Sequence, residues 1–381
     1  MINRLSLSFW FVGLVCFSFS CTNEEALQGS IELRDIAYKD STSIFLKLDA
    51  ESSVNNLFYQ IVDLGDSKFY CFFNRQNFRF YFYDLSDTDR YFRTTPFAKE
   101  GPNGIGSLIF SFDVQPDSTI LLHSYYLKSL IQVNFNGEVL KRRKILGGRS
   151  TFSSMKTPII ETEEQLYLYS ESTSFNGNVQ ETPILYALPK HGNDSLMDVG
   201  VRLPEFYQND KEGKYVSELS VPAMTYNERN RTILIGFPLS DSISILNAAG
   251  EFIEKRYFGH PDFHLKPKIK ANQLGNVPIS GLKATLSYDR YSSLLYDATN
   301  NIYLRRLNWQ TPEEQLENNV FGVVSTVIVA DSAFNIIGQV AYNGPTDQVI
   351  HEGKIFQFSP MLNTEDSLMV NIYSIDLDQA K

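Results

Sequence analysis

The sequence holds only three cysteines in 381 residues, Cys16, Cys21 and Cys71. A disulfide framework needs several paired cysteines and a Cys-based zinc site needs clustered ones, so the sequence excludes both. No segment after residue 20 approaches the run of about 18 apolar residues that indicates a membrane-spanning helix. Amphipathic spans of three helical turns are also missing. These absences leave a domain built from short apolar segments.

Nucleophile motifs and positive charge are scarce as well. The chain has no G-x-S-x-G, and no serine lies in a strand–tight turn–helix context that would expose its hydroxyl group. The 34 lysines and arginines face 44 aspartates and glutamates, which gives a formal net charge of −10. Such an acidic chain has little to offer a polyanion, so we expect no nucleic-acid partner.

The first twenty residues have the pattern of a secretory signal peptide. Arg4 supplies a basic start, residues 5–19 form an apolar run too short to span a bilayer comfortably, and Ser20 precedes Cys21. This arrangement resembles a bacterial lipoprotein signal, in which Cys21 becomes the lipid-modified first residue. An ordinary signal peptide followed by a chance cysteine is the alternative. The predicted parts of the chain are a signal peptide at 1–20, an acidic lipid-anchored tether at 21–29 and a folded domain at 30–381.

The residues after the predicted cleavage point carry a further signal. The stretch T-N-E-E at 22–25 is acidic and follows Cys21 directly. It resembles the surface-export signal of Bacteroidetes lipoproteins. We therefore expect a cell-envelope protein, attached to the outer membrane through lipid on Cys21, with exposure at the cell surface as a further expectation.

Almost every later apolar segment is short and alternates with period two. Examples are F-R-F-Y-F-Y at 78–83 and N-I-Y-L-R at 301–305. Successive side chains of a β-strand point to opposite faces, so this alternation predicts strands and an all-β fold. Cys71 lies in the apolar run F-Y-C-F-F at 69–73 and is expected to be a small buried hydrophobic residue.

These strands recur in units. A polar turn and an alternating strand are followed each time by a second strand, a tight turn and a third strand. The polar turn and first strand of the units read QPDSTILLHS (115–124), ETEEQLYLYS (161–170), NERNRTILIGF (227–237), DATNNIYLRR (297–306) and NTEDSLMVNIY (363–373). A period of about 40–50 residues with four short strands per unit is typical of a β-propeller.

Five complete units and one partial unit predict a single domain, a six-bladed β-propeller. The units are 54–94, 108–146, 157–203, 221–258, 290–342 and the partial 354–377. The missing strands are expected at the N-terminus, at 31–36 and 43–48, because strands from both termini close a ring without leaving an open sheet edge. Two separate β-sandwiches are the alternative, since short, regularly spaced strands suit them too.

The whole pattern resembles a known family. The chain length, the lipoprotein start, F-x-K-E-G-P-N-G-I-G at 97–106 and the blade pattern are together similar to functionally uncharacterised Bacteroidetes lipoproteins. That resemblance implies a TolB-like six-bladed propeller over essentially the whole mature chain. The family has no assigned catalytic residues, so the resemblance implies a fold and a location but no mechanism.

The glycine-rich stretch K-E-G-P-N-G-I-G at 99–106 raises the question of a phosphate-binding loop. Such a loop needs glycines between a buried strand and a helix, whereas a strand at 108–112 follows here. We interpret it as a connector between blades, where glycine permits a positive φ angle, and we expect no nucleotide and no cofactor. The stretch places Lys99, Glu100 and Asn103 among the candidate ligand-binding residues.

Four long irregular segments fall on one face of the predicted ring, which we call the long-loop face. They are 171–182, 204–220, 259–289 and 308–322. Long loops in a compact domain are usually functional or disordered. The predicted ligand-binding residues on this face, besides the three in the connector, are Trp309, Arg305, Arg306, Phe263, His264 and Lys266. Aromatic rings beside cations suit a glycan, a peptide or an acidic partner; the alternative is that the loops merely pack on one another.

The candidates for chemistry are weak. His260 and His264, with Asp262 between them, have the spacing of a metal pair on a helix face, but no periodic helix surrounds them. We favour solvated loop histidines and predict no metal and no catalytic residues. The sequence favours a non-catalytic binding or scaffold propeller with a glycan, peptide or protein partner. A hydrolase, lactonase or lyase is the alternative, and it would need acidic or histidine side chains converging at the ring axis.

Overall fold

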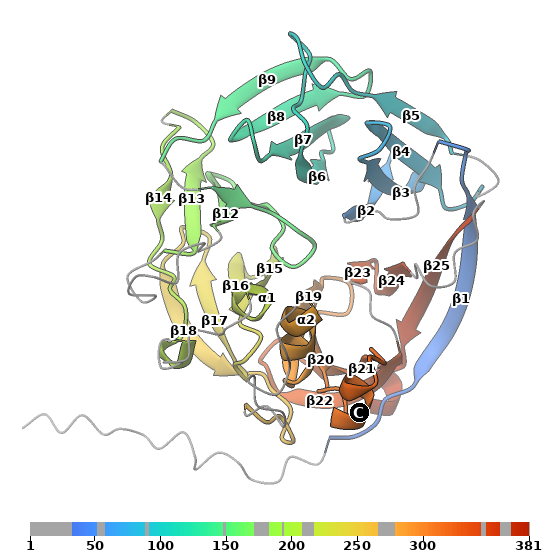
Figure 1. The fold of residues 1–381 in the computed structure, drawn as a ribbon, viewed down its shortest axis with the longest axis vertical. Helices are drawn as coiled ribbons and strands as arrows, with labels where there is room; N and C mark the ends of the chain where they lie inside the picture. The colour runs from blue at the N-terminus through green and yellow to red at the C-terminus, as the bar shows by residue number, and fades with distance from the viewer. Residues whose placement is uncertain are drawn as a thin grey trace, which may run out of the picture. The chain divides into compact units, whose positions relative to one another are not determined.

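The structure, a computed structural model, confirms the six-bladed β-propeller. Six antiparallel sheets are arranged in a ring within the compact unit Leu33–Lys381 (Figure 1). The predicted signal peptide, Cys21 and the tether at 21–29 lie outside the residues that the structure describes. The described residues are 33–51, 58–87, 91–147, 150–170, 183–192, 194–207, 217–265, 279–343, 348–358 and 367–380.

In the first five blades the strands follow one another in the chain, from the inner side of the blade outward. The first three blades are β2 (Tyr59–Leu64), β3 (Ser67–Asn74), β4 (Arg79–Asp84) and β5 (Arg93–Pro96); β6 (Ile109–Val114), β7 (Thr119–Ser124), β8 (Ser129–Asn134) and β9 (Val139–Lys144); and β10 (Thr151–Phe152), β11 (Ile160–Glu161), β12 (Gln165–Ser170), β13 (Leu185–Pro189) and β14 (Met197–Asp198). The next two are β15 (Ala223–Asn227), β16 (Thr232–Gly236), β17 (Ser242–Asn247) and β18 (Phe252–Tyr257); and β19 (Arg290–Asp297), β20 (Ile302–Asn308), β21 (Val324–Ala330) and β22 (Ile336–Asn343).

The sixth blade closes the ring with strands from both ends of the chain, as predicted. Its strands are β23 (Gln348–His351), β24 (Lys354–Phe358), β25 (Ser367–Ile375) and β1 (Tyr38–Lys47). Two details of the prediction were wrong. The blade begins at β23 rather than at residue 354, and the N-terminus supplies one strand to it rather than two. The segment before β1 instead adds to the edge of β22, where the Ile36 amide donates to the Gln339 carbonyl at 2.7 Å and the Gln339 amide donates to Arg34 at 2.8 Å.

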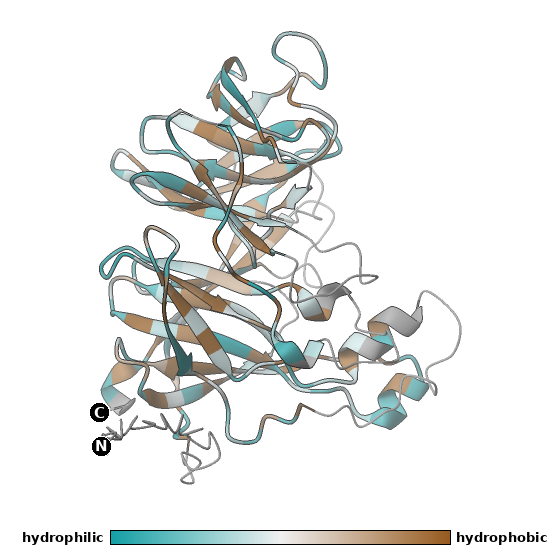
Figure 2. Ribbon diagram, turned by 90° about the vertical axis from the view of Figure 1, so that its left-hand side faces the viewer, coloured by the Kyte–Doolittle hydropathy of each residue, from teal (hydrophilic) through white to brown (hydrophobic). Residues whose placement is uncertain are grey.

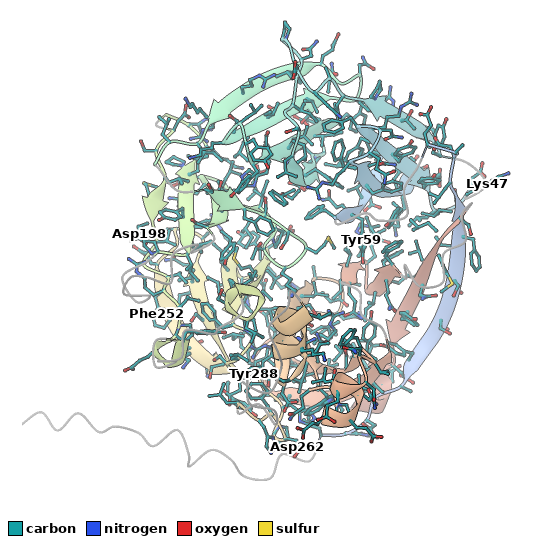
Figure 3. The ribbon with its side chains drawn as sticks, viewed as in Figure 1. Lys47, Tyr59, Asp198, Phe252, Asp262 and Tyr288 are labelled. Carbon is teal, nitrogen blue, oxygen red and sulfur yellow. The ribbon has the colours of Figure 1, made fainter. Side chains whose placement is uncertain are left out.

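Side chains from inner strands lie near the centre of the ring and those of outer strands lie at its rim. Tyr59 of β2 marks the centre, and Lys47, Asp198 and Phe252, each from the outermost strand of its blade, mark the rim (Figure 3). Outer strands are accordingly exposed on one or both faces, as in β18, where Phe252 is 63 % exposed.

A separate hydrophobic core fills each junction between neighbouring blades. In β3, Cys71 packs against the second blade and Phe72 packs against the sixth, because alternate side chains point to opposite faces. Both faces of a blade are therefore buried, which explains the continuous apolar run at 69–73. Cys71 is fully buried, as predicted, and its burial raises the pKa of the thiol well above its ordinary value.

The helices belong to the long connections. They are α1 (Ser217–Ser220), α2 (Ile279–Leu286) and α3 (Glu313–Glu317), with 3-10 turns η3 (Glu205–Tyr207) and η6 (Leu377–Ala380). The three α-helices lie in the connections assigned to the long-loop face and project from one side of the sheets (Figure 2). The long segments 171–182, 208–216 and 266–278 lie outside the described residues.

Candidate functional site

Arg305, a predicted ligand-binding residue, is buried between the fourth and fifth blades. It is 1 % exposed, and its guanidinium donates to the carbonyls of Phe258 at 2.6 Å, Ser240 at 2.6 Å and Phe237 at 3.2 Å. The guanidinium carbon lies 3.7 Å from the centre of the Tyr291 ring. These contacts join two blades and leave Arg305 almost no exposed surface.

The neighbouring candidates are also partly or wholly buried. Arg306 is 3 % exposed and donates from Nε to Ser292 at 2.6 Å. The Trp309 indole donates to Thr326 at 2.9 Å, and the Trp309 ring packs against the core between the fourth and fifth blades. Phe263 packs against that same core. Of this group, Trp309 and Phe263 keep part of their surface exposed.

The two histidines of the H-P-D-F-H stretch have different surroundings. His264 is exposed, as expected of a loop histidine. The same expectation was wrong for His260, which is 6 % exposed, shares a hydrogen bond with Gln339 at 2.8 Å and contacts the Trp309 ring edge-on. The His260 Nδ1 atom accepts from the Asp262 amide at 3.0 Å, so hydrogen bonds occupy both ring nitrogens. Lys266 lies outside the described residues.

The connector at 99–106 lies along the outer strand of the second blade. Its interpretation as a link between blades is confirmed, because it joins β5 to β6, and Gly101 and Gly106 have φ angles of +85° and +84°. Asn103 accepts from the Val139 amide of β9 at 3.2 Å. In Figure 1, β9 lies across the ring from β20 and β21.

Lys99, Glu100 and Asn103 of the connector therefore lie far from the candidate residues of the fifth blade. Lys99 and Glu100 are exposed, and the Lys99 ammonium lies 4.3 Å from the centre of the Phe78 ring. Their distance from the fifth blade means that the structure does not bring the nine predicted residues into one site. Ligand binding by any of them stays a prediction.

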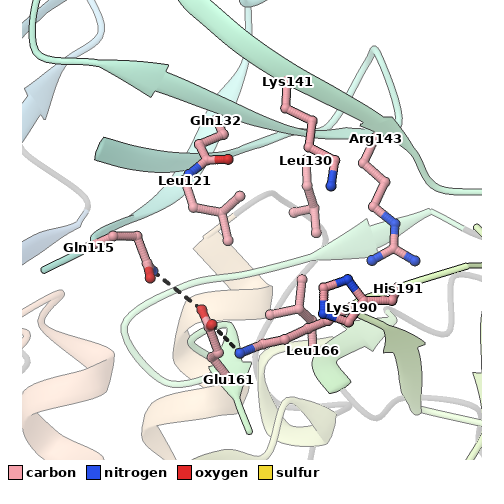
Figure 4. A pocket seen from close by; sticks show the side chains of 10 residues that line it. All are labelled: Gln115, Leu121, Leu130, Gln132, Lys141, Arg143, Glu161, Leu166, Lys190 and His191. Carbon is pink, nitrogen blue, oxygen red and sulfur yellow. Dashed lines mark hydrogen bonds and ion pairs between the residues drawn. The ribbon is translucent and has the colours of Figure 1, made fainter. Parts of the chain in front are cut away.

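A pocket of about 200 Å³ lies at the junction of the second and third blades (Figure 4). Its floor is apolar and its walls are polar. The lining residues are Gln115, Leu121, Leu130, Gln132, Lys141, Arg143, Glu161, Leu166, Lys190 and His191. Lys141 and Arg143 reach from β9 toward Lys190 and His191, which follow β13 (Figure 4). Cationic side chains from two blades thus face each other across an apolar floor.

Ion pairs hold part of this lining in place. Lys190 pairs with Glu161, and Arg143 donates from Nε to Asp194 at 2.7 Å. Lys141 is exposed and forms no ion pair with the described residues. Lys190 neutralises Glu161 and Arg143 is paired with Asp194, so Lys141 is the lysine of the lining whose charge no carboxylate of the described residues pairs with.

The pocket exists because the third blade is irregular. Its inner strand is broken into β10 and β11, with two residues each, and its outer strand β14 also has only two. The core at this junction is correspondingly small, with five buried members that include Leu130 and Leu166. Short strands cover less of the neighbouring blade, and the uncovered part of β8 and β9 becomes the wall of the pocket.

A chain of polar side chains runs from the pocket toward the inner strands. Gln115 donates to Asp113 at 2.5 Å and to Glu161 at 3.3 Å, and Gln60 of β2 donates to Asp113 at 2.8 Å. Burial, together with the charge of Glu161, raises the pKa of the Asp113 carboxyl to about 6. Two carboxyl groups from the second and third blades therefore share one amide near the pocket.

A second polar network is closed off from solvent. His123 is fully buried and hydrogen-bonded to Ser153 through Nδ1 and to Thr151 through Nε2, and Ser111 donates to Ser153 at 2.5 Å. Burial lowers the pKa of His123 to about 4, so the ring is neutral at pH 7. A serine hydrogen-bonded to a neutral histidine has the arrangement of a nucleophile and its general base. Here the hydroxyl groups provide hydrogen-bond partners for the nitrogens of a buried imidazole ring.

Three potential metal ligands meet where the ring closes. Asp63 of β2, His351 of β23 and Glu352 place ligand atoms within 4.8 Å of one another. His351 Nε2 lies 3.0 Å from Asp63, and Lys68 pairs with Glu352. The ammonium of Lys68 already supplies positive charge beside Glu352, so the three side chains are explained by polar contacts that join the sixth and first blades.

Comparison with known proteins places this geometry in a family. A family model described as a domain of unknown function, DUF4221, matches residues 40–339. The chain belongs to the DUF4221 family. No curated protein matches it. No helix among the described residues is long and apolar enough to cross a membrane.

Solved structures share the fold of this DUF4221 chain. A DUF4221 member from Bacteroides vulgatus is 18 % identical, with a TM-score of 0.73 over 90 % of this chain and 98 % of that one. A second similar structure is a protein from Bacteroides fragilis whose name proposes that it is exported. It is 12 % identical, with a TM-score of 0.56 over 90 % of this chain and 97 % of that one. A virginiamycin B lyase from Staphylococcus aureus is 9 % identical over 87 % and 99 %, and its TM-score of 0.42 is too low to bear on activity.

The pocket of this DUF4221 chain was missed from the sequence. In the sequence, the run K-R-R-K at 141–144 has the pattern of a basic outer edge strand, which guards against sheet pairing, with a polyanion-binding patch as the alternative. Alternation along a strand places Lys141 and Arg143 on the same face, and that signal was available. Their counterparts Lys190 and His191 follow a strand of another blade, so only the fold brings the two pairs together.

Proposed function

We propose that this DUF4221 protein is a non-catalytic binding propeller of the cell envelope, whose pocket between the second and third blades binds a carboxylate-bearing group of a peptide or glycan partner. The observation that carries the proposal is the placement of cationic side chains around an apolar floor. Lys141, Arg143 and Lys190 line the pocket; Glu161 pairs with Lys190 and Asp194 pairs with Arg143, and Lys141 has no ion pair with the described residues.

The size and polarity of the pocket support a small acidic group. About 200 Å³ is less than drug-sized ligand sites occupy, and it suits one acidic side chain or one acidic sugar unit. The floor of Leu121, Leu130 and Leu166 offers an apolar surface to the carbon skeleton of such a group. Arginine and lysine above it supply charge-assisted hydrogen bonds to the carboxylate.

The proposed location rests on the N-terminus and on one relative. Residues 1–20 have the pattern of a signal peptide, and Cys21 is the proposed site of lipid attachment to the outer membrane. A structurally similar Bacteroides fragilis protein carries a name that proposes export. Radiolabelled palmitate incorporation by the wild-type chain and by Cys21→Ala tests the anchor; label in the variant would contradict it.

Substitution of Lys141 tests the pocket. Acidic peptides and uronic-acid glycans are offered to the purified chain, with neutral versions of each as a reference. Lys141→Gln should weaken binding of the acidic ligands about tenfold, because one charge-assisted hydrogen bond is lost. Lys144→Gln is the matched control, since Lys144 is exposed on the same strand outside the pocket. Equal binding by both variants, or preference for neutral ligands, would contradict the proposal.

One observation keeps hydrolase or lyase chemistry as a second candidate. Asp113 and Glu161 both contact Gln115, and the raised pKa of Asp113 suits a carboxyl that gives a proton near neutral pH. A panel of lactones and uronic-acid glycosides tests it by product release. An enzyme is favoured if the wild-type chain releases product, Asp113→Asn abolishes that turnover and Lys144→Gln preserves it. If the wild-type chain shows no turnover, this candidate function is removed.

A further inference from the structure

One polar side chain of the pocket between the second and third blades has a place that strand pairing fixes. Gln132 lies on the middle one of three neighbouring strands, where it pairs with Leu121 of β7 on one side and with Lys141 of β9 on the other. Directly paired residues of antiparallel strands point to the same face. The three side chains therefore stand in a row on the face that lines the pocket (Figure 4).

Hydrogen bonds determine which end of the Gln132 amide enters the pocket. The Thr119 hydroxyl donates to the Asp117 carboxylate at 2.6 Å, because a carboxylate can only accept. A hydroxyl has one proton, so the Thr119 oxygen is left to accept, and it does so from the Gln132 Nε2 atom at 3.0 Å. The Gln132 Oε1 atom is thereby directed to the side where Lys141 lies (Figure 4). The pocket thus contains an oriented acceptor beside its cationic side chains.

A ligand that uses both features needs a hydrogen-bond donor close to its carboxylate. The Cβ atoms of directly paired residues lie about 4.5–5.5 Å apart, so Gln132 and Lys141 can hold two groups of one small unit. In the last residue of a peptide, a single Cα atom separates the amide nitrogen from the carboxylate carbon, which places these atoms about 2.5 Å apart. Such a residue can donate from its amide to Gln132 and offer its carboxylate to Lys141.

The floor of the pocket favours a peptide end over an acidic sugar. Leu121, Leu130 and Leu166 present aliphatic carbon to the ligand. A sugar acid carries several hydroxyl groups, and each of them needs a partner once it leaves water. Leucine side chains supply none, whereas they suit the aliphatic side chain of a terminal residue. A pocket of about 200 Å³ also has more room for a chain that ends than for one that passes through.

We propose that this pocket binds the C-terminal residue of a peptide or protein partner whose last side chain is aliphatic. The terminal carboxylate pairs with Lys141, the last amide N–H donates to the Gln132 Oε1 atom, and the aliphatic side chain packs on the three leucines. Thr119 acts through Gln132 and is a positioning residue. The inference rests on the proposed function of the pocket and narrows its ligand to one chemistry.

Binding of short peptides to the purified chain tests this inference. Fluorescence anisotropy measures the affinity of N-terminally labelled Gly-Ser-Gly-Leu, of its C-terminal amide, and of two forms with one N-methyl group, on the last amide or on the amide before it. The C-terminal amide and the form methylated at the last amide should each bind about tenfold more weakly. The other methylated form should bind like the parent peptide, because a different nitrogen donates to Gln132.

Variants assign each contact to its residue. Lys141→Gln should lose the preference for a free carboxylate, and Gln132→Leu should lose the effect of methylation at the last amide. Thr119→Val should reduce that effect, because valine cannot accept a hydrogen bond and leaves the Gln132 amide free to turn. Gln315→Leu, exposed on α3, is the matched control and should bind like the wild type. Equal weakening of all four peptides by Gln132→Leu would overturn the assigned contact.

Two further probes separate this inference from the proposed function. They are glucuronate and the C-terminal amide of Gly-Glu-Gly-Leu, offered as competitors of the labelled parent peptide. If either competes as well as unlabelled Gly-Ser-Gly-Leu, the pocket takes acidic groups in general, which overturns the inference and leaves the proposed function standing. Equal affinity for the free and amidated peptides would also overturn the inference. If no acidic probe binds, both are overturned.

Discussion

The Arg305 guanidinium carbon lies 3.7 Å from the centre of the Tyr291 ring, inside the junction of the fourth and fifth blades. Its nitrogens donate to the carbonyls of Phe258, Ser240 and Phe237, all from the fourth blade or its turns. Burial lowers the pKa of Arg305 to about 10, which leaves it protonated at neutral pH. This side chain connects two blades through hydrogen bonds and a cation–π contact.

Removal of that connection should destabilise the ring. We expect Arg305→Met to lower the free energy of unfolding by about 3 kcal/mol, because three buried carbonyls lose their donor. Arg256→Met, on the exposed outer strand of the fourth blade, should change it by less than about 0.5 kcal/mol. Urea denaturation measures both. Similar values for the two variants would show that the buried contacts contribute little.

Trp309 is predicted to act through packing. Its ring lies against the core between the fourth and fifth blades, and its indole N–H bonds to Thr326. We expect Trp309→Ala to cost about 2–3 kcal/mol in unfolding free energy and Trp309→Phe to cost less, since phenylalanine retains most of the contact. Chemical denaturation followed by circular dichroism measures both. A stable Trp309→Ala that loses affinity for a ligand would instead establish the binding role expected from the sequence.

Two adjacent residues of β1 test the closure of the ring. Leu46 is fully buried between the sixth and first blades, whereas Phe45 next to it is 54 % exposed. We expect Leu46→Ala to lower the unfolding free energy by about 2–4 kcal/mol and Phe45→Ala to change it little. Thermal and urea unfolding give the comparison. Equal costs would mean that β1 does not present its alternate faces as the structure shows.

Two buried groups give opposite dependences of stability on pH. The pKa of Asp113 is raised to about 6, so the folded state holds its proton more tightly and stability falls as pH rises from about 4 to about 6. The pKa of His123 is lowered to about 4, so the unfolded state binds more protons between about 4 and 6.5 and stability rises with pH there. The two contributions oppose each other in the wild type.

Single substitutions should separate these contributions. Asp113→Asn should make stability rise with pH across the window, and His123→Gln should make it fall, each by roughly 2–3 kcal/mol from end to end. Urea denaturation at half-unit pH steps gives both slopes, with wild type as the nearly flat reference. Parallel curves for all three proteins would show that neither group has a shifted pKa.

The sequence was enough to predict the propeller because its evidence is local. Alternation within each strand and the recurrence of turn and strand need no knowledge of distant contacts, and they identified the blades and the closure by both termini. The third blade and the N-terminus departed from the pattern for tertiary reasons. The 34–36 segment pairs with the edge of β22 in the fifth blade, whereas the sequence prediction placed it in the sixth blade. Alternation within a strand does not indicate which open sheet edge the strand joins.

The binding sites were harder to predict from the sequence. Alternation along a strand shows which residues share a face, but it does not show which neighbouring blade that face contacts. Arg305 and Arg306 are adjacent, yet one faces the fourth blade and the other the sixth. Both were predicted from the sequence as ligand-binding residues of the long-loop face. The pocket depends on side chains of β9 and of the segment after β13, which are about fifty residues apart and meet only across a junction.

The pairing of β1 with β25 has a consequence for the order in which the chain folds. Strand β1 (Tyr38–Lys47) pairs with β25 (Ser367–Ile375), and 328 positions separate the paired residues Ser43 and Asn371. During translation β1 cannot pair with β25 until that distant segment has been made, so this contact of high sequence separation forms late. Loss of β25 would leave both the sixth blade and β1 unable to complete the ring.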